Sequence, residues 1–399
     1  MNDELDYMLF VIFRSIIATL ERQHCKDNKK QIKERRNGKN NTNESFLRTS
    51  LRFFLFVVFC CFFLSMLLFL LLLSQQNSTK MKKAYILLLA LVLALPGNAR
   101  TLRLLYWNIQ NGMWADQGYN YDNFVHFVDS LKPDICVWCE AASIFQTDSD
   151  KALPSTDDKY LPYNWDELAL RYGHPYVYLG GWHDNYPQVI TSRYPIRNVK
   201  RLLNSEDGSV SIAHGASWAQ LDLQGQTVNI VTLHTWPMGY DRDADDRKAS
   251  AAEGGGDKYR RREIEAICSQ TILTHPDAAN EYWLMMGDFN SPSRVDSAHY
   301  NYPSNSTKYL TLDYVREQTP YLDIIAEKHL GEFHQSIAGE RRIDFVCCTP
   351  AFYRCISEAH IIPQDPSGWL NLQSANLSNF NYPSDHLPIL VDFNLKHRK

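Results

Sequence analysis

Apolar stretches of this chain repeatedly end in polar side chains of the kinds used for metal binding and phosphate chemistry. Carboxylates and amides are oxygen ligands for hard divalent cations, and imidazole gains or loses a proton near neutral pH. The residues concerned are Asn108 after "LLYW", Glu140 after "ICVWC", His234 after "VTL", Asp288 and Asn290 after "LMMG", Asp344 in "RRIDFV", and Asp385 with His386 before "LPIL".

Each of these residues alone has an ordinary explanation, because a single Asn or Asp at a strand end is commonly a turn former or a helix cap. Together the set contains four acids, two histidines and two amides beside large apolar segments. Burying so many polar groups would cost free energy unless they pair with one another or bind a cation. The set therefore predicts one shared site.

The segments that carry these residues have the composition of β-strands, rich in β-branched and aromatic residues and bounded by turn formers. In "MMGDFN", positions two apart share a face, so Asp288 and Asn290 point the same way while Phe289 turns into the core. "LDLQGQTVNI" predicts a hairpin around a Gln-Gly turn. The expected strands are "LRLLYWNIQ", "ICVWCEA", "QVITSRYPI", "ASWAQLDL", "TVNIVTLHTW", "YWLMMGDFN", "RIDFVCCT" and "LPILVDFNL".

Helical periodicity is clear in two places. Residues 121–132 place Phe124, Phe127, Val128 and Leu131 on one face before Pro133, and residues 258–275 contain a similar apolar face. Many strands with a few amphipathic helices predict two packed sheets flanked by helices. Residues 100–399 contain no long linker or repeat, so we expect them to form one domain.

The first 99 residues differ from the rest and contain two export-like signals. Residues 52–73 are almost entirely apolar and long enough to span a bilayer, with Lys and Arg clustered just before them. Residues 81–99 have the layout of a secretory signal peptide that begins at Met81. We expect Met81 to be the true start and residues 1–80 to be upstream sequence translated in frame. The alternative is that residues 1–80 are a real membrane anchor.

The remaining part of the chain is acidic. The chain has 41 Lys and Arg and 45 Asp and Glu, of which residues 1–99 hold 14 and 7, so residues 100–399 have a net charge of −11. Tight, sequence-independent binding of a polyanion relies on Lys and Arg. This charge weighs against nucleic acid as the substrate, although a local basic patch would be compatible with it.

Six of the nine cysteines follow residue 99. Cys136 and Cys139 in "CVWC" have the spacing of a redox or zinc motif, but in a strand positions three apart face opposite sides. No second pair with zinc-knuckle spacing follows them. We therefore expect core cysteines. Export would permit a disulfide, for example between Cys348 and Cys355, although the sequence assigns none.

The motifs resemble, in order and combination, the endonuclease/exonuclease/phosphatase superfamily, which includes DNase I-like nucleases, inositol polyphosphate 5-phosphatases and neutral sphingomyelinases. The resemblance covers residues 101–394 and implies an α+β fold, a four-layer αββα sandwich of two packed, mostly antiparallel β-sheets flanked by helices. It also implies a phosphoric ester hydrolase that depends on Mg²⁺ or Mn²⁺. The matching segments are "YWNIQN", "PDICVWCEA", "ITSRYPI", "VTLHTWP", "MMGDFNSPS", "RRIDFVCC" and "SDHLPILVDF".

For the metal, the resemblance implies Glu140 as the direct ligand, with Asn108 and Asp385 completing or supporting the site. Some nucleases of the family carry a further acid where this chain has Gln110, so one ligand is absent. Arg193 in "SRYPI" is either a phosphate contact or a structural partner.

For catalysis, Asp288 would orient and deprotonate the attacking water, and Asn290 would hold the phosphate or the water in line. His386 would bind phosphoryl oxygens, with Asp344 accepting its other N–H and fixing its tautomer. His234 would be a general acid or a phosphate contact on the leaving-group side.

The expected function is thus an exported phosphoesterase that hydrolyses a phosphomonoester or phosphodiester by in-line attack of an activated water. A small-molecule or lipid-linked substrate is favoured, and no feature indicates an obligate protein partner. One alternative is an extracellular DNase I-like endonuclease. Another is a non-catalytic member that binds phosphorylated ligands or a partner, although the intact motif residues weigh against it. The expected location is secreted or periplasmic, or membrane-anchored if residues 52–73 are retained.

Overall fold

The described part of the chain is its C-terminal three quarters. The computed structural model describes residues 100–113, 116, 119–142, 165–181, 186–223, 225–363 and 383–395. These residues belong to one compact unit, Asn98–Lys399. None of the helices within these ranges is long and apolar enough to cross a membrane. Residues 1–80, with the apolar stretch 52–73, and residues 81–99 lie outside the described residues, so the predictions made for them remain predictions.

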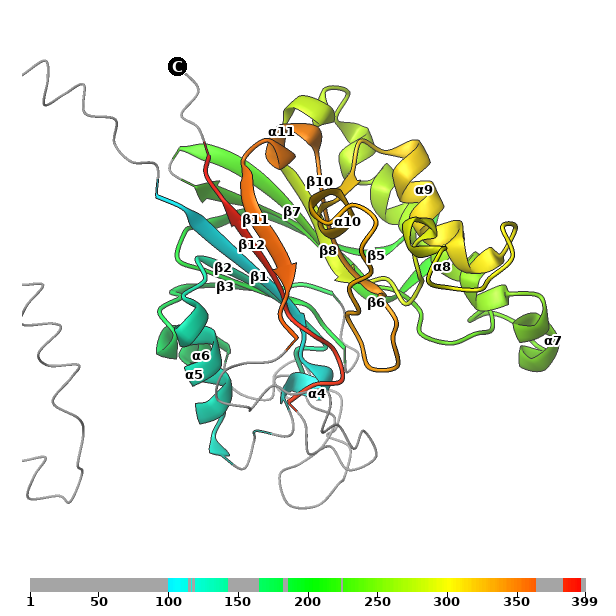
Figure 1. The fold of residues 1–399 in the computed structure, drawn as a ribbon, viewed down its shortest axis with the longest axis horizontal. Coiled ribbons are helices and arrows are strands. Elements are labelled where there is room, and N and C mark those ends of the chain that lie inside the picture. Colours follow the sequence, from blue (N-terminus) through cyan, green and yellow to red (C-terminus); the bar gives the residue numbers. More distant parts are fainter. Residues whose placement is uncertain are drawn as a thin grey trace, which may run out of the picture. The chain divides into compact units, whose positions relative to one another are not determined.

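The first six-stranded sheet combines strands from both ends of the described chain (Figure 1). Its central strands β1 and β2 are parallel, and its other pairs are antiparallel. Its strands, in spatial order, are β11 (Ile356–Ile361), β12 (Ile389–Phe393), β1 (Leu102–Asn108), β2 (Ile135–Cys139), β4 (Val189–Ser192) and β3 (Tyr176–Leu179).

The second six-stranded sheet is formed by the middle of the chain. Here β7 and β8 are parallel and the other pairs are antiparallel, which confirms the prediction of mostly antiparallel sheets. The predicted hairpin joins β6 and β7 at Gly225, whose φ of +81° favours glycine. The strands, in spatial order, are β5 (Ile196–Asn204), β6 (Ser211–Leu223), β7 (Gln226–His234), β8 (Trp283–Asp288), β10 (Asp344–Cys348) and β9 (Leu322–Asp323).

Helices cover the outer faces of the two sheets (Figure 1). The predicted helices appear as α5 and α8, with Phe124, Phe127 and Val128 of α5 buried as expected. The helices are α4 (Gln110–Met113), α5 (Asp122–Leu131), α6 (Trp165–Arg171), α7 (Arg247–Ala252), α8 (Gly255–Ser269), α9 (Leu310–Gln318), α10 (Ile324–Lys328) and α11 (Pro350–Tyr353), with 3₁₀ turns at Ile272–Thr274, Ala278–Asn280, Arg294–Asp296 and Thr307–Tyr309.

Alternate residues of the second sheet pack into two different cores. Ile230 of β7 and Leu284 of β8 join the cluster that contains the first sheet, whereas Val231 and Met285 join the cluster that contains α8 and α9. This alternation is expected when both faces of a strand are covered. On the other side, Phe124 of α5 packs against Trp138 of β2. The layers therefore run helix, sheet, sheet, helix, which confirms the predicted αββα sandwich.

The cysteines after residue 99 are core residues. Cys136 and Cys139 are fully buried and free, which confirms their expected packing role. Cys348 and Cys355 are free as well, so the disulfide considered for them is not formed.

Candidate active site

The polar residues meet because of the strand directions. Parallel strands have their carboxyl ends at the same edge of a sheet, and this applies to β1 with β2 and to β7 with β8. In register, Asn108 lies beside Cys139, with Glu140 next along the chain, and His234 lies beside Asp288. Packing the two sheets face to face brings these two edges together.

Asn108 connects the acids of the two sheets. Its side chain is fully buried, and Nδ2 lies 3.2 Å from Glu140 Oε1 and 3.2 Å from Asp288 Oδ2. The same nitrogen lies 3.4 Å from His386 Nε2. Asn108 Oδ1 accepts the backbone N–H of Gln110 at 3.1 Å. Asn108 therefore supports and positions its neighbours, which is one of the two roles expected for it.

Glu140 is held in an unusual backbone conformation. Its φ is +54°, in the left-handed region that non-glycine residues seldom occupy and that recurs at functional sites. The turn α4 after β1 is left-handed too, and its Asn111 N–H donates to Glu140 Oε2 at 3.1 Å. Burial raises the pKa of Glu140, as does Asp385, against the opposing effect of His386. Glu140 is thus a fixed carboxylate oriented toward the shared site.

His386 is paired with Asp344 as expected. Its Nδ1 lies 2.8 Å from Asp344 Oδ2, and because a carboxylate only accepts, Nδ1 carries the proton. The other carboxylate oxygen accepts the Tyr106 hydroxyl at 2.8 Å, and Ser336 Oγ donates to Oδ2 at 2.7 Å. Burial alone would lower the pKa of His386, but Asp344, with Asp288 and Asp385, raises it well above its ordinary value. The neighbouring carboxylates therefore favour the protonated, imidazolium form of His386.

Asp288 lies at the centre of the cluster. It is buried, and its Oδ1 accepts the Asn290 backbone N–H at 2.8 Å. Its Oδ2 lies 3.7 Å from His386 Nε2 and 3.8 Å from His234 Nε2. Burial raises the pKa of Asp288, and the charge of Asp344 adds to this while His386 opposes it. A carboxylate with a raised pKa is a stronger base, which suits proton removal from a water.

His234 is buried and neutral. Burial lowers its pKa well below the ordinary value, and His214 and His386 lower it further. Its ring lies 4.4 Å from that of His214, centroid to centroid. A neutral imidazole can donate one hydrogen bond to a phosphoryl oxygen. It lacks the second ring proton that a general acid would transfer to the leaving group. Of the two expected roles, the environment favours the phosphate contact.

Asn290 and Asp385 lie at the rim of the cluster. Asn290 has a φ of +47°, and its Nδ2 donates to the Thr235 carbonyl at 3.0 Å, which leaves its Oδ1 and the second N–H of Nδ2 for a ligand. Asp385 Oδ1 lies 3.8 Å from His386 Nε2, and its backbone N–H donates to Gln110 Oε1 at 3.3 Å. Asn290 therefore adjoins Asp288, and Asp385 adjoins His386.

The donor set fits a divalent cation. Four carboxyl groups, those of Glu140, Asp288, Asp344 and Asp385, gather around one imidazole, so full ionisation would give the cluster excess negative charge. Burying such an excess is costly unless a cation balances it. Ligand atoms of Glu140, His234 and Asp288 lie within 4.8 Å of one another, as do those of Asp288, Asp344 and His386. Carboxylate oxygens are the ligands that Mg²⁺ and Mn²⁺ prefer.

Arg193 is not brought into this cluster. It follows β4, which runs antiparallel to β2, so it lies beyond the opposite end of β2 from Glu140. There its Nη1 pairs with Asp134 at 3.4 Å, and its backbone N–H donates to the Asp134 carbonyl. Arg193 is a structural partner in this structure, and the predicted substrate contact is at the wrong edge of the sheet.

Two supporting residues escaped the sequence-based search. Tyr106 shares a strand face with Asn108, and the two-residue spacing was a usable signal for its inward direction. Ser336 lies in an irregular segment, where its hydroxyl donates to Asp344 and accepts the Ile343 N–H at 3.0 Å. No local pattern in the sequence distinguishes Ser336 from an ordinary loop serine.

No protein-family model matches the chain, and no curated protein matches it. Among solved structures, an AP endonuclease from Archaeoglobus fulgidus is 16% identical with a TM-score of 0.49, over 74% of this chain and 100% of that one. The 3'-5' exonuclease NExo from Neisseria meningitidis is 16% identical with a TM-score of 0.48, over 74% and 100%. The human Nocturnin catalytic domain is 14% identical with a TM-score of 0.47, over 74% and 94%. Values this low do not assign an activity to the chain.

Proposed function

We propose that this chain is a divalent-metal-dependent phosphoesterase of the endonuclease/exonuclease/phosphatase type. The observation that carries the proposal is the pairing of Asp288, a buried carboxylate with a raised pKa, with a His386 imidazolium fixed by Asp344. A basic carboxylate beside a positively charged imidazolium is suited to the attack of water on phosphorus. In that attack the water loses a proton and negative charge builds up on the phosphoryl oxygens.

In the proposed reaction, Asp288 accepts a proton from the water. At the same time the water oxygen bonds to phosphorus, in line with the leaving oxygen. The phosphorus–oxygen bond to the leaving group then breaks. His386 and the His234 N–H stabilise the charge on the phosphoryl oxygens, while Asp344 keeps His386 in the required tautomer. Glu140 and Asp385, supported by Asn108, would hold Mg²⁺ or Mn²⁺, which supplies further charge stabilisation when bound.

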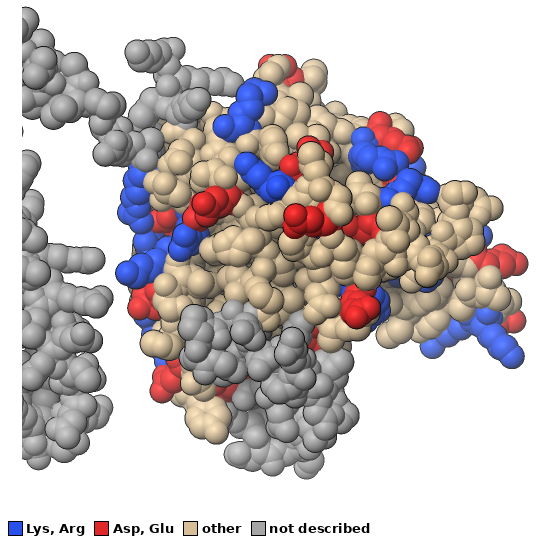
Figure 2. All heavy atoms as spheres, in the orientation of Figure 1, with Lys and Arg blue, Asp and Glu red and all other residues tan. Residues whose placement is uncertain are grey.

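We propose a small-molecule or lipid-linked phosphoester as the substrate. The net charge of −11 over residues 100–399 does not favour a polyanion. On the described surface visible in Figure 2, blue basic side chains are interspersed with red acidic ones in small groups. Export through residues 81–99 is part of the proposal, since these residues have the layout of a signal peptide. A native peptide from residues 1–80 in mass spectrometry would contradict the start at Met81.

A substrate panel tests the proposal. The purified full chain with Mg²⁺ is assayed on p-nitrophenyl phosphate, bis-p-nitrophenyl phosphate, inositol phosphates, a phospholipid and supercoiled plasmid. We expect hydrolysis of a small or lipid-linked ester that chelation abolishes. Glu140→Gln should demand a much higher Mg²⁺ concentration, whereas Glu358→Gln, at an exposed position, should behave as wild type. Nicking of plasmid at low enzyme would favour the nuclease, and inactivity on every substrate would favour the binding function.

A further inference from the structure

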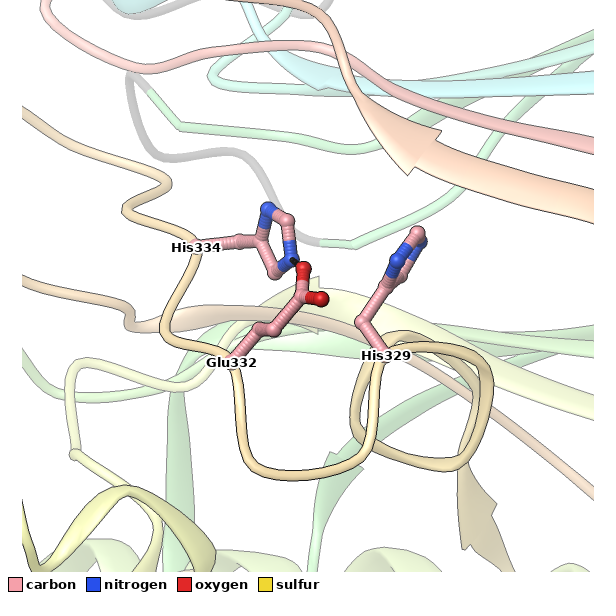
Figure 3. Close-up of side chains that lie close together, drawn as sticks. All are labelled: His329, Glu332 and His334. Atoms are coloured by element: carbon pink, nitrogen blue, oxygen red, sulfur yellow. Dashed lines mark ion pairs between the residues drawn. The ribbon is translucent and has the colours of Figure 1, made fainter.

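A second cluster of metal-ligand side chains lies outside the candidate active site, in the loop that follows α10. It consists of His329, Glu332 and His334, whose ligand atoms lie within 4.8 Å of one another. Figure 3 shows the Glu332 carboxylate between the two imidazole rings. We propose that these three residues bind a Zn²⁺ ion. The proposal does not depend on the phosphoesterase activity.

The backbone of the loop brings the ligands together. His329 caps the carboxyl end of α10, and the Glu332 N–H donates back to the His329 carbonyl at 3.0 Å. Gly331 has a φ of +79° at the third position of this turn, where a type II turn requires glycine. The turn therefore returns Glu332 to the side of His329, whereas side chains three positions apart in an extended chain would face opposite sides.

Phe333 fixes the orientation of the next two ligands. Its ring stacks on that of His299, with centroids 3.6 Å apart and planes 7° from parallel. In an extended segment, alternate side chains face the same way. Because Phe333 is directed to His299, Glu332 and His334 are directed together to the other side. Glu332 Oε2 lies 3.3 Å from His334 Nε2.

The hydrogen bonds of the two histidines leave ring nitrogens for an ion. His329 Nε2 lies 2.7 Å from the Ala359 carbonyl of β11, and a carbonyl only accepts, so Nε2 carries the proton and Nδ1 is left with its lone pair. A histidine that ligates a metal commonly donates its other N–H to a carbonyl in this way. His334 Nε2 is buried and, among the described residues, has no hydrogen-bond partner despite its proximity to Glu332.

The donor chemistry and spacing suit Zn²⁺. Two imidazoles and one carboxylate, with water in the fourth position, form an established tetrahedral zinc set. Bonds of about 2.0 Å in that geometry separate donor atoms by roughly 3.3 Å. The Glu332–His334 pair already has this separation, and all three ligand atoms lie within 4.8 Å of one another. Glu332 is 67% exposed, so the site is open to an incoming ion.

Metal binding to a variant that lacks the candidate active site tests the proposal. The full chain carrying Glu140→Gln and Asp288→Asn is stripped with chelator and titrated with Zn²⁺ against a chromophoric chelator, in excess Mg²⁺. We expect one tight Zn²⁺ per chain. Adding His334→Ala or His329→Ala should weaken this binding by about 100-fold or more, and Glu332→Gln by about tenfold. His126→Ala, at an exposed position of α5, should have no effect.

Thermal melting keeps the result interpretable if a variant folds poorly. Zn²⁺ at about 100 times its dissociation constant should raise the Tm of the parent and of His126→Ala by about 5 °C, and that of His334→Ala by about 1 °C or less. Co²⁺ in place of Zn²⁺ should give the visible absorption of a tetrahedral ion, lost with His334→Ala. The proposal is overturned if the parent binds no Zn²⁺, or if His334→Ala binds it as tightly.

Discussion

The two sheets have the same order of strand directions, but the carboxyl ends of their central parallel strands carry different side chains. In each, an edge strand and its antiparallel neighbour lead to a central parallel pair, and two antiparallel strands follow. By position β1 corresponds to β7 and β2 to β8, and each parallel pair is joined through a helix, α5 or α8. The register pair at the end is Asn108 with Cys139 in the first sheet and His234 with Asp288 in the second.

The next strand in each sheet widens this difference. In the second sheet, β10 places Asp344 opposite Asp288, whereas in the first sheet β4 places Val189 opposite Trp138. The second sheet therefore supplies the proposed base and the carboxylate that pairs with His386, and the first supplies Asn108 and Glu140. Equivalent backbone frameworks thus hold different chemistry, and the proposed site is complete only where the two sheets meet.

The largest expected effect concerns one pair of equivalent positions that carry different side chains in the two sheets. These are Asp288 in β8 and Cys139 in β2. Asp288→Asn removes the proposed base and should lower kcat by about 10³-fold, within the range of general-base contributions. Cys139→Ala changes the corresponding position of the other sheet and should leave kcat within about threefold. Steady-state kinetics on the best substrate of the panel checks this. A kcat for Asp288→Asn within tenfold of wild type would refute the role of the base.

The position one residue earlier in each strand tests the packing of the backbone rather than the proposed catalysis. The second sheet has Gly287 where the first has Trp138, and a Cβ on Gly287 would lie 2.0 Å from the Leu233 carbonyl oxygen of β7. Gly287→Ala should therefore lower the free energy of unfolding by about 3 kcal/mol, measured by urea denaturation. Gly239→Ala, which has open space around the new Cβ, is the control. Equal stability of the two variants would mean that β7 and β8 do not approach so closely.

The helices that cover the two sheets also differ in the polarity of the side chains that they bury. The buried residues of α5 are apolar, whereas α8 buries Glu263, whose carboxylate accepts the Ala213 N–H at 2.7 Å and the Trp236 N–H at 2.9 Å. Burial raises the pKa of Glu263 to about 7. The folded chain therefore binds more protons than the unfolded chain between the ordinary pKa of a glutamate and pH 7. Stability relative to Glu263→Gln should fall as pH rises through this window, by about 3 kcal/mol at most.

Urea unfolding at several pH values from 4.5 to 7.5 measures how the stability difference between wild type and Glu263→Gln changes with pH. Any pH-independent destabilisation caused by the substitution does not affect this slope. Glu265→Gln, at an exposed position of the same helix, should reproduce the wild-type slope. If Glu263→Gln also keeps the wild-type slope, then the carboxyl group is ionised throughout the window and burial does not control it.

The smallest expected effect concerns the link between the sheets. Tyr106→Phe removes the hydroxyl that β1 donates to Asp344 of β10, and should cost about 1 kcal/mol of stability. Tyr321→Phe is a matched control, because the Tyr321 hydroxyl is buried and accepts or donates no hydrogen bond among the described residues. Tyr321→Phe should be neutral or slightly stabilising. A larger loss for Tyr321→Phe than for Tyr106→Phe would contradict the proposed link.

The sequence predicted the interior strands of both sheets and missed the edges. Every strand buried between two neighbours was anticipated, because such strands are long apolar runs. The four that were not anticipated are the edge strands β11, β3, β5 and β9. In β5, five consecutive residues are exposed, and in β11 exposed and buried residues mix, so neither has an apolar signature. Their pairing is decided by tertiary contacts that composition does not record.

The site was predictable to the extent that strand ends were recognisable. Asn108, Glu140, Asp288 and His386 were found because each adjoins an apolar run. Arg193 also adjoins one, but β4 is antiparallel to β2, so its carboxyl end lies at the far edge. Strand direction depends on which strands become neighbours, and a local pattern contains no such information. Ser336 was missed for the same reason, since only the fold brings it to Asp344.

β12 is the last described strand, yet it lies inside the first sheet, between β11 and β1. His386 lies three residues before it, so both His386 and the strand that joins β11 to β1 follow all the other described strands along the chain. A nascent chain that ends after β10 contains Tyr106 and Ser336 as partners for Asp344 but lacks His386. Of the described side chains in this cluster, the one with the raised imidazole pKa is therefore the last to be synthesised.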